Sequence, residues 1–104
     1  MSDGFSELNT HKLLYRLQPT SKFKKDIKRL KKRGFDLSLL KTVVTMLACG
    51  MQLPRKYCDH PLKGNKKGYR DCHILDNWVL IYKIDKDLLI LVLSETGTHA
   101  DILD

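Results

Sequence analysis

The sequence predicts an α+β domain in which a two-helix hairpin packs on a small, mostly antiparallel sheet, in the order β-α-α-β-β-β. Apolar residues recur at spacings of three and four between about residues 20 and 50, which is the helical period. Helical periodicity then stops, and three short strand-like runs follow, separated by tight turns. Strands joined in this way form antiparallel hairpins, so we expect both helices on one face of the sheet.

The first half of the chain contains one predicted strand. Residues 1–12 show little periodicity, and we expect a flexible leader there. Residues 13–104 are predicted to form a single domain, because 104 residues allow one modest core. The strand is expected over residues 13–17, and Pro19 closes it.

Two helices follow this strand. The first is predicted over residues 20–33, with Thr20 or Ser21 as its cap, and the second over residues 36–50. Outside its apolar stripe the first helix is almost entirely basic. We interpret that surface first as a solvated face and second as a contact for RNA or the ribosome. The second helix is far more apolar, so it should be the more buried one.

The second half of the chain supplies the rest of the sheet. A basic loop rich in proline and glycine leads to a strand over residues 69–75. A tight turn at residues 76–77 precedes a strand over 78–84, and a turn at 85–87 precedes a strand over 88–95. No internal repeat interrupts this pattern.

Composition limits the partners of the protein. The net charge of +7 and the pI near 9.4 favour nucleic acid, an acidic protein or an anionic membrane. No apolar run approaches the roughly 20 residues that span a bilayer. The cysteines are odd in number and lack C-x-x-C spacing, which fits a reducing compartment. We therefore expect a cytoplasmic protein that does not bind membranes.

Three histidines suggest chemistry on RNA. His60, His73 and His99 lie in a basic stretch that also contains Trp78. Histidine exchanges protons near neutrality, basic side chains attract phosphate, and aromatic rings stack on unpaired bases. A single strand histidine would more often only satisfy a hydrogen bond. Three in so basic a setting favour proton transfer on a polyanion, and the basic residues concerned are Lys63, Lys66, Lys67, Arg70 and Lys83.

Alternation assigns these residues to faces of the sheet without saying which face is open. Tyr69, Asp71 and His73 share one face of their strand. In the next strand, Trp78 belongs with Leu80 and Tyr82 on one face and Lys83 lies on the other. Pro61 restrains His60 in its loop, and Gly97 is expected to bend the chain so that His99 returns over the sheet.

A zinc site is the alternative interpretation of the histidines. Their separations of 13 and 26 residues match no short zinc signature. Cys58 and Cys72 are close enough in sequence to complete such a site. We nevertheless predict no metal and no cofactor.

Five segments together resemble the YafQ branch of the RelE/ParE toxin superfamily. The resemblance extends from about residue 13 to residue 103, and its ordered cluster of motifs is more specific than any single histidine. The motifs are Leu53-Pro54, Asp59-His60-Pro61-Leu62-Lys63-Gly64, Lys67-Gly68-Tyr69-Arg70-Asp71-Cys72-His73, Trp78-Val79-Leu80-Ile81-Tyr82 and Thr96-Gly97-Thr98-His99.

The resemblance implies a toxin of a bacterial type II toxin–antitoxin pair. Such toxins cut mRNA, commonly in the 30S A site of the translating ribosome, and form a hetero-oligomer with a DinJ-like antitoxin that neutralises them. His60, His73 and His99 correspond to active-site histidines of the family. We assign His60 as base and His99 as acid, or the reverse, with His73 orienting the phosphate. The predicted substrate-binding residues are Trp78, Arg70, Lys63, Lys66, Lys67, Tyr69, Lys83 and Leu103.

Three positions depart from the family pattern. Asn77 stands where the family usually has an acidic residue, Glu95 where it commonly has arginine, and Leu103 where it has an aromatic residue. Glu95 would repel phosphate unless Lys83 or Arg70 compensates, or it could keep His99 protonated. Asp71, Asn77 and Glu95 are therefore site residues of undecided role.

Two other functions share this fold. The departures also fit a weak or inactive module that binds an antitoxin and contributes to operon repression. A ParE-like inhibitor of DNA gyrase is the third hypothesis, but gyrase inhibition does not require the three histidines.

Overall fold

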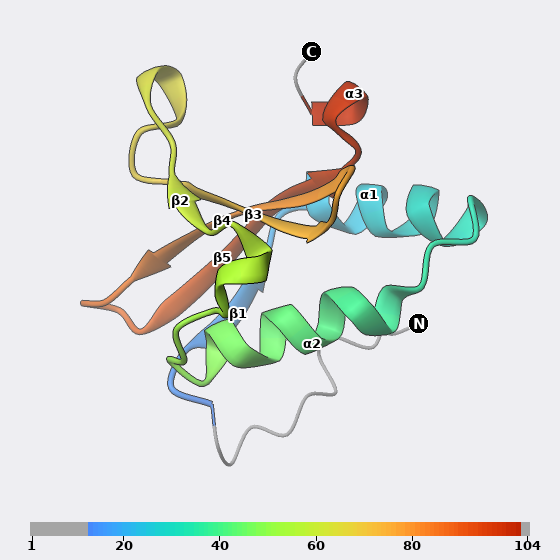
Figure 1. Cartoon of the computed structure of the whole chain (residues 1–104). Helices are drawn as coiled ribbons and strands as arrows, with labels where there is room; N and C mark the ends of the chain where they lie inside the picture. The colour runs from blue at the N-terminus through green and yellow to red at the C-terminus, as the bar shows by residue number, and fades with distance from the viewer. Residues whose placement is uncertain (1–12, 103–104) are drawn as a thin grey trace.

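The computed structural model describes residues 13–102, so the predicted leader and Leu103 lie outside the described residues. One five-stranded sheet, in the order β1-β5-β4-β3-β2, forms the centre of the protein (Figure 1). The elements are β1 (Arg16–Pro19), α1 (Ser21–Lys32), α2 (Leu37–Ala48), η2 (Arg55–Tyr57), β2 (His60–Pro61), η3 (Gly64–Lys66), β3 (Arg70–Leu75), β4 (Trp78–Asp85), β5 (Ile90–Gly97) and α3 (His99–Ile102).

The sheet confirms the predicted fold class. β2, β3, β4 and β5 are antiparallel neighbours, and β1 alone runs parallel to its neighbour β5. The predicted order of two helices between the first strand and the later hairpins is correct. Four short elements were not predicted: the 3-10 helices η2 and η3, the strand β2 and the helix α3. Of these, β2 and α3 each carry a histidine.

The first strand begins later than predicted. The backbone N–H groups of Leu14 and Tyr15 both donate to the carbonyl of Ala48, at 2.8 and 2.9 Å, so this segment pairs with the end of α2. Pairing with β5 starts only at Arg16. The prediction of a strand over residues 13–17 was therefore displaced, because a helix terminus competed for the same backbone donors.

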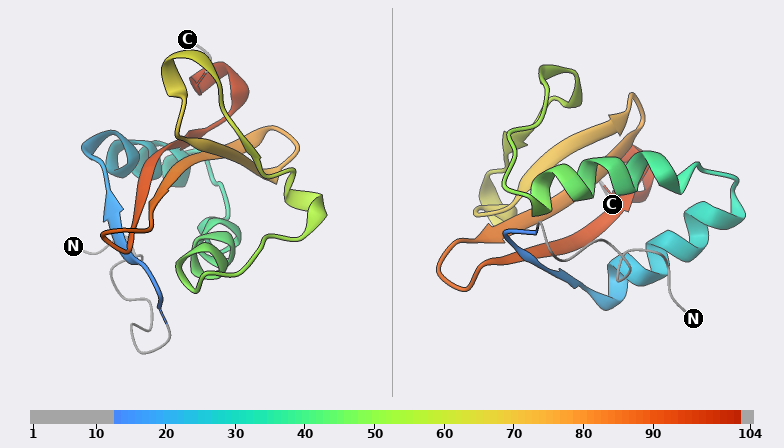
Figure 2. Two further views of the ribbon diagram at one scale, coloured as in Figure 1. Left: turned by 90° about the vertical axis from the view of Figure 1, so that its left-hand side faces the viewer. Right: turned by 90° about the horizontal axis from the view of Figure 1, so that it is seen from below.

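Side-chain caps begin both long helices. The Thr20 hydroxyl accepts from the N–H of Phe23 at 3.0 Å and donates to the carbonyl of Ser94 at 2.6 Å, which ties α1 to β5. Asp36 accepts from the N–H of Ser38 at 3.0 Å and so caps α2. The two helices run in roughly opposite directions along the sheet (Figures 1 and 2), as the predicted hairpin requires.

Both helices pack on the same face of the sheet. Their apolar residues form one core with alternate residues of the three long strands, including Cys72, Leu80 and Leu91. Trp78 and Tyr82 belong to that core and are 1% exposed. The face that alternation left open is therefore settled, since Trp78, Leu80 and Tyr82 turn towards the helices.

The opposite face of the sheet carries the polar residues. The register aligns His60 with Asp71, Asp71 with Ile81, and Ile81 with Glu95, in one row across four strands. The loop between β2 and β3 and the helix α3 rise on this side, away from α2 (Figure 1). We call it the histidine face. Within residues 13–102 no helix is long and apolar enough to cross a membrane.

Candidate active site

The histidine face gathers three histidines from three separate elements. His60 lies in β2, His73 in β3 and His99 at the start of α3. The rings of His73 and His99 meet edge to face, with 5.4 Å between their centroids. His60 lies opposite Asp71 in the register, one strand spacing from the strand of His73. Residues that are far apart in sequence are thus brought to one surface.

Asp71 is the centre of this cluster. Its pKa is raised, chiefly because burial disfavours the carboxylate, while the nearby His60, His73 and His99 oppose that shift. His73 Nε2 lies 3.8 Å from Asp71 Oδ1, which is beyond hydrogen-bond distance. Asp71 Oδ1 is buried and has no hydrogen-bond partner in the part of the chain that the structure describes. A carboxylate so placed can stabilise an imidazole that has taken up a proton.

The ring of His60 is fixed by the backbone before it. His60 Nδ1 lies 2.7 Å from the carbonyl oxygen of Cys58, and a carbonyl can only accept. Nδ1 therefore carries the hydrogen, and Nε2 of the neutral ring is left with a free lone pair. Cys58 adopts a left-handed conformation, with φ of 50°, which is unusual for a residue other than glycine. The chain bends sharply there before entering β2.

Asp59 anchors the same segment to the sheet. Its carboxylate accepts the hydroxyl of Tyr82 and pairs with Arg70, whose NH2 lies 3.1 Å from Asp59 Oδ2. Burial is the main cause that raises the pKa of Tyr82, so its hydroxyl keeps its proton and donates. His60 follows an anchored residue, and this fixes its position relative to β3.

Arg70 does not lie on the histidine face. It was predicted to bind substrate, but it alternates with Asp71 and therefore points to the other side of β3. Its guanidinium pairs with Asp59, and that hydrogen bond raises the pKa of Arg70. The structure gives Arg70 a role in holding the segment that carries His60.

Asn77 orients His99. Asn77 Oδ1 lies 3.2 Å from the backbone nitrogen of His99 and 2.8 Å from His99 Nδ1. The backbone N–H must donate, so the amide oxygen is the acceptor and Nδ1 carries the hydrogen. His99 therefore presents Nε2 with the same free lone pair as His60. At this departure from the family pattern, the asparagine makes the contact without adding a charge.

The helix α3 is held by a reciprocal cap. The N–H of Thr98 donates to Asp101 Oδ2 at 2.9 Å, and the N–H of Asp101 donates to the Thr98 hydroxyl at 3.3 Å. The spacing of a threonine three residues before an aspartate is the sequence signal that could have predicted this helix. It sets the direction in which His99 leaves β5.

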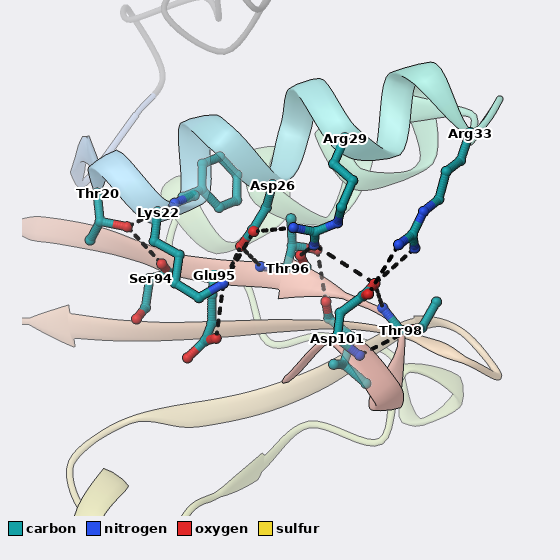
Figure 3. Close-up of polar contacts among 12 residues, drawn as sticks. Thr20, Lys22, Asp26, Arg29, Arg33, Ser94, Glu95, Thr96, Thr98 and Asp101 are labelled. Atoms are coloured by element: carbon teal, nitrogen blue, oxygen red, sulfur yellow. Dashed lines mark hydrogen bonds and ion pairs between the residues drawn. The ribbon is translucent and has the colours of Figure 1, made fainter. Parts of the chain in front are cut away.

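Two arginines of the first helical segment then bind this cap. Arg33 pairs with both oxygens of Asp101 at 3.0 and 3.2 Å, and Arg29 NH2 lies 3.7 Å from Asp101 Oδ2 (Figure 3). The hydrogen bond from Arg33 is the main cause that lowers the pKa of Asp101 far below its usual range. α1 thus holds the turn that carries His99.

Gly97 serves close packing at this point. A Cβ on Gly97 would lie 2.9 Å from the Cβ of Asp101 and 3.0 Å from Arg29 NH2. Gly97 is the last residue of β5 and does not have a positive φ. The expected bend at Gly97 is therefore replaced by a different need for glycine, which is room for the side chains that hold α3.

The predicted lysines are distributed unevenly. Lys63 and Lys67 are exposed on the β2–β3 loop, and Lys66 Nζ pairs with Glu95 Oε2 at 2.6 Å. Lys83 lies over the ring of Tyr69, with 5.5 Å from Nζ to the centroid. Arg70 and Lys83, which the sequence left open as compensating charges, form no ion pair with Glu95 among the described residues. That function falls to Lys66 and to Lys22, whose Nζ is 3.7 Å from Glu95 Oε1.

Trp78 is separated from the histidines by the sheet itself. Its indole packs edge to face on Phe35, with 5.0 Å between centroids, and its N–H donates to the Thr96 hydroxyl at 3.0 Å. With 1% of its surface exposed, it cannot stack on a base in this conformation. The prediction that Trp78 binds substrate does not fit this placement.

A cavity of about 760 Å³ opens beside the histidine pair. Its lining includes Phe35, Tyr57, His73, Asn77 and Thr98. His73 and the residue that orients His99 therefore border a space large enough for a small organic group.

The two cysteines considered for a zinc site lie in different environments. Cys72 is fully buried on the core face, and burial raises the pKa of its thiol. Cys58 is exposed at the end of η2. Across residues 13–102, no group of three or more histidine, cysteine, aspartate or glutamate side chains is arranged to hold a metal ion.

Comparison with known proteins identifies the family. Residues 15–104 match the model of the family described as YafQ, the bacterial toxin of a type II toxin–antitoxin system. This chain belongs to the YafQ toxin family. The mRNA interferase toxin YafQ of Escherichia coli is 42% identical over 85 residues, which cover 81% of this chain and 90% of the relative. An mRNA interferase is an RNA-cleaving enzyme.

Solved structures of YafQ relatives share the fold. The E. coli DinJ–YafQ toxin–antitoxin complex contains a chain that matches with a TM-score of 0.81 and 38% identity, covering 88% of this chain and all of the other. A metal-bound toxin from Helicobacter pylori matches with a TM-score of 0.80 and 43% identity, covering 85% of this chain and 98% of the other.

Proposed function

We propose that this chain is a ribosome-dependent mRNA endoribonuclease that works by acid–base transesterification without a metal, and that a DinJ-like antitoxin neutralises it. The observation that carries the proposal is that two imidazoles of the histidine face carry their hydrogen on the same ring nitrogen, Nδ1. His60 and His99 each use Nδ1–H to bind a fixed acceptor, which leaves Nε2 free to exchange a proton. Family membership and the E. coli mRNA interferase support the same substrate.

The reaction needs one proton acceptor and one proton donor. The ribose 2′-oxygen attacks the adjacent phosphorus while the bond from phosphorus to the 5′-oxygen breaks, giving a 2′,3′-cyclic phosphate and a 5′-hydroxyl. We assign Nε2 of neutral His60 to take the 2′-hydroxyl proton, and protonated Nε2 of His99 to give a proton to the leaving oxygen. Each such role is worth about 10²–10⁴-fold in rate.

Asp71 and His73 support this exchange. All three histidines lie close enough to Asp71 to favour its charged form and so to oppose the effect of burial on its pKa. After His60 has accepted a proton, that carboxylate offsets the new positive charge. His73 packs on His99 and borders the cavity, where it can orient the phosphate.

The partners follow from charge and family. A net charge of +7 attracts both the ribosome and an acidic antitoxin segment that folds over the histidine face. The relative from E. coli has been solved as a DinJ–YafQ complex, which supports a DinJ-like antitoxin in a hetero-oligomer with this chain. Action in the A site of the ribosome places the protein in the cytoplasm.

Primer extension on translating ribosomes tests the proposal. Wild type should cut mRNA in the A site, and His99→Ala should reduce cutting by at least about 10²-fold. His11→Ala is the matched control, because it removes a histidine outside the motif cluster. Cuts that persist in His99→Ala would overturn the mechanism. Absence of cleavage by wild type, with antitoxin binding intact, would instead indicate the inert binding module.

A modified mRNA tests which histidine is the acid. Replacing the leaving 5′-oxygen by sulfur gives a thiolate leaving group that needs little protonation. His99→Ala should then regain most of its activity, and His60→Ala should stay impaired. Rescue of His60→Ala in place of His99→Ala would reverse the two roles.

A further inference from the structure

Glu95 is a buried acid on a face that should bind phosphate. It lies in β5 in the same cross-strand row as Asp71 and His60, and it is 7% exposed. Adjacent strands lie about 4.8 Å apart, so Glu95 is about two strand spacings from Asp71. An unpaired carboxylate at that distance would oppose the approach of an RNA backbone.

Both oxygens of Glu95 have a cation beside them. Lys66 Nζ lies 2.6 Å from Oε2, and Lys22 Nζ lies 3.7 Å from Oε1. Lys22 also pairs with the buried Asp26 at 3.2 Å, so its charge is shared between two carboxylates (Figure 3). Lys66 has no second carboxylate among the described residues. Among the described carboxylates, Glu95 is therefore the one that fixes the position of the Lys66 ammonium.

Lys66 comes from a loop whose one ion pair within residues 13–102 is the pair with Glu95. The loop contains η3 and two glycines with positive φ, Gly64 at 66° and Gly68 at 95°. Its other lysines, Lys63 and Lys67, make no ion pair within residues 13–102. The Lys66 side chain is 45% exposed, and an ammonium has three donors. One binds Glu95, which leaves the others available at the open face.

We propose that Glu95 is a positioning residue that holds the ammonium of Lys66 over the histidine face, where Lys66 binds an RNA phosphate. The inference rests on the proposed nuclease function. Two residues then do the work of the arginine that the family commonly has at this position. The carboxylate of Glu95 on the strand fixes the ammonium of Lys66 from the loop, and Lys66 supplies the positive charge.

Glu95→Gln separates this inference from simple charge repulsion, because the two predict opposite signs. Glutamine has nearly the same shape and removes one negative charge. If Glu95 only repelled phosphate, RNA binding would strengthen. If Glu95 positions Lys66, binding should weaken by about tenfold, since the charged hydrogen bond that orders Lys66 is lost.

The experiment measures binding and cleavage separately. Affinity for a 2′-O-methyl RNA, which cannot be cleaved, is measured by fluorescence anisotropy for wild type, Glu95→Gln, Lys66→Ala and the double variant. We expect both single variants to weaken binding about tenfold, and the double variant to be no weaker than Lys66→Ala. Lys66→Arg should bind nearly as wild type, because it keeps the ion pair and the cation.

Two matched controls account for charge alone. Lys86→Ala removes an exposed cation and Asp87→Asn removes a carboxylate, both in the β4–β5 turn, to which no site role is assigned. Each should change affinity by less than about threefold. On ribosomes, Glu95→Gln should raise KM more than it lowers kcat. Thermal unfolding of each variant shows whether the fold is retained.

Several outcomes would overturn the inference. Tighter binding by Glu95→Gln would show that the pair blocks the site, and additive losses in the double variant would show that the two residues act independently. If wild type bound RNA and depended on Lys66 and Glu95 yet cut no mRNA, the nuclease proposal would fail while the positioning of Lys66 would stand.

Discussion

The two faces of the sheet use their residues for different purposes. Towards the helices, apolar side chains from α1, α2 and alternate strand positions form one continuous core. On the other face, three histidines gather around Asp71, Glu95 pairs with Lys66 of the loop, and Asp71 Oδ1 has no hydrogen bond to any described residue. The face towards the helices stabilises the fold. On the histidine face, burying the Asp71 carboxylate is unfavourable for stability, and such perturbed groups are typical of sites that carry out chemistry.

The face of the sheet on which a residue lies therefore indicates its role better than its position along the strand does. His73 and Trp78 are separated by one tight turn, yet the sheet divides them, so one borders the cavity and the other is fully buried. Arg70 and Asp71 are neighbours in sequence and also point to opposite sides. We expect substitutions on the two faces to affect different measured quantities.

The largest expected effect is the difference in stability between a substitution on the side that faces the helices and one on the histidine face. Trp78→Ala should lower the free energy of unfolding by about 3–5 kcal/mol, because it empties a packed site and frees the Thr96 hydroxyl. His73→Ala should change stability by less than about 1 kcal/mol and reduce cleavage. Denaturant unfolding and primer extension measure the two quantities. A Trp78→Phe variant that folds but no longer cuts would show that Trp78 has a direct role in catalysis.

A smaller effect is expected at Asp101, whose ion pair with Arg33 holds the turn that carries His99. Asp101→Asn should lower kcat by about ten- to a hundredfold with little change in KM, because α3 no longer fixes His99. The depressed pKa of Asp101 means that its contribution to stability is present above the unfolded pKa near 4 and is lost as the pH falls below it. An unfolding series from pH 7 to pH 3 should show that loss in wild type and not in the variant. A proportional rise in KM would point to a role in substrate binding.

The smallest effect tests the cost of the charge on the histidine face. Burial raises the pKa of Asp71, so its charged form is disfavoured in the folded state. Asp71→Asn should therefore raise the free energy of unfolding at pH 7 while it impairs cleavage. The gain should appear as the pH rises through the unfolded pKa near 4, and vanish below it, where both forms are neutral. A less stable variant at pH 7 would mean that Asp71 is a structural residue.

Much of the fold followed from local patterns. The helix caps at Thr20 and Asp36, the apolar stripes and the tight turns predicted both helices and the three long strands within a few residues. β2 and α3 escaped prediction because two residues and four residues are too short to show a period. Each exists because a neighbour supplies its hydrogen bonds.

The candidate site was predictable in composition and less so in arrangement. The histidines and the basic loop were identified from the motif cluster, and the structure brings His60, His73 and His99 around Asp71. The anchors could not be predicted, since Asp101 pairs with Arg33, 68 residues away, and Asp59 pairs with Arg70 across the β2–β3 loop. A charge in a sequence does not identify its partner.

The sequence by itself determined the fold class, the family and the kinds of side chain available for chemistry, because periodicity, caps and ordered motifs are local properties of a chain. Only the tertiary structure decided that Trp78 is buried, that Arg70 and Lys66 bind carboxylates, and which imidazole nitrogens are free. The physical reason is that the side of a strand that faces water, and the partner that a charge finds, depend on what packs against it.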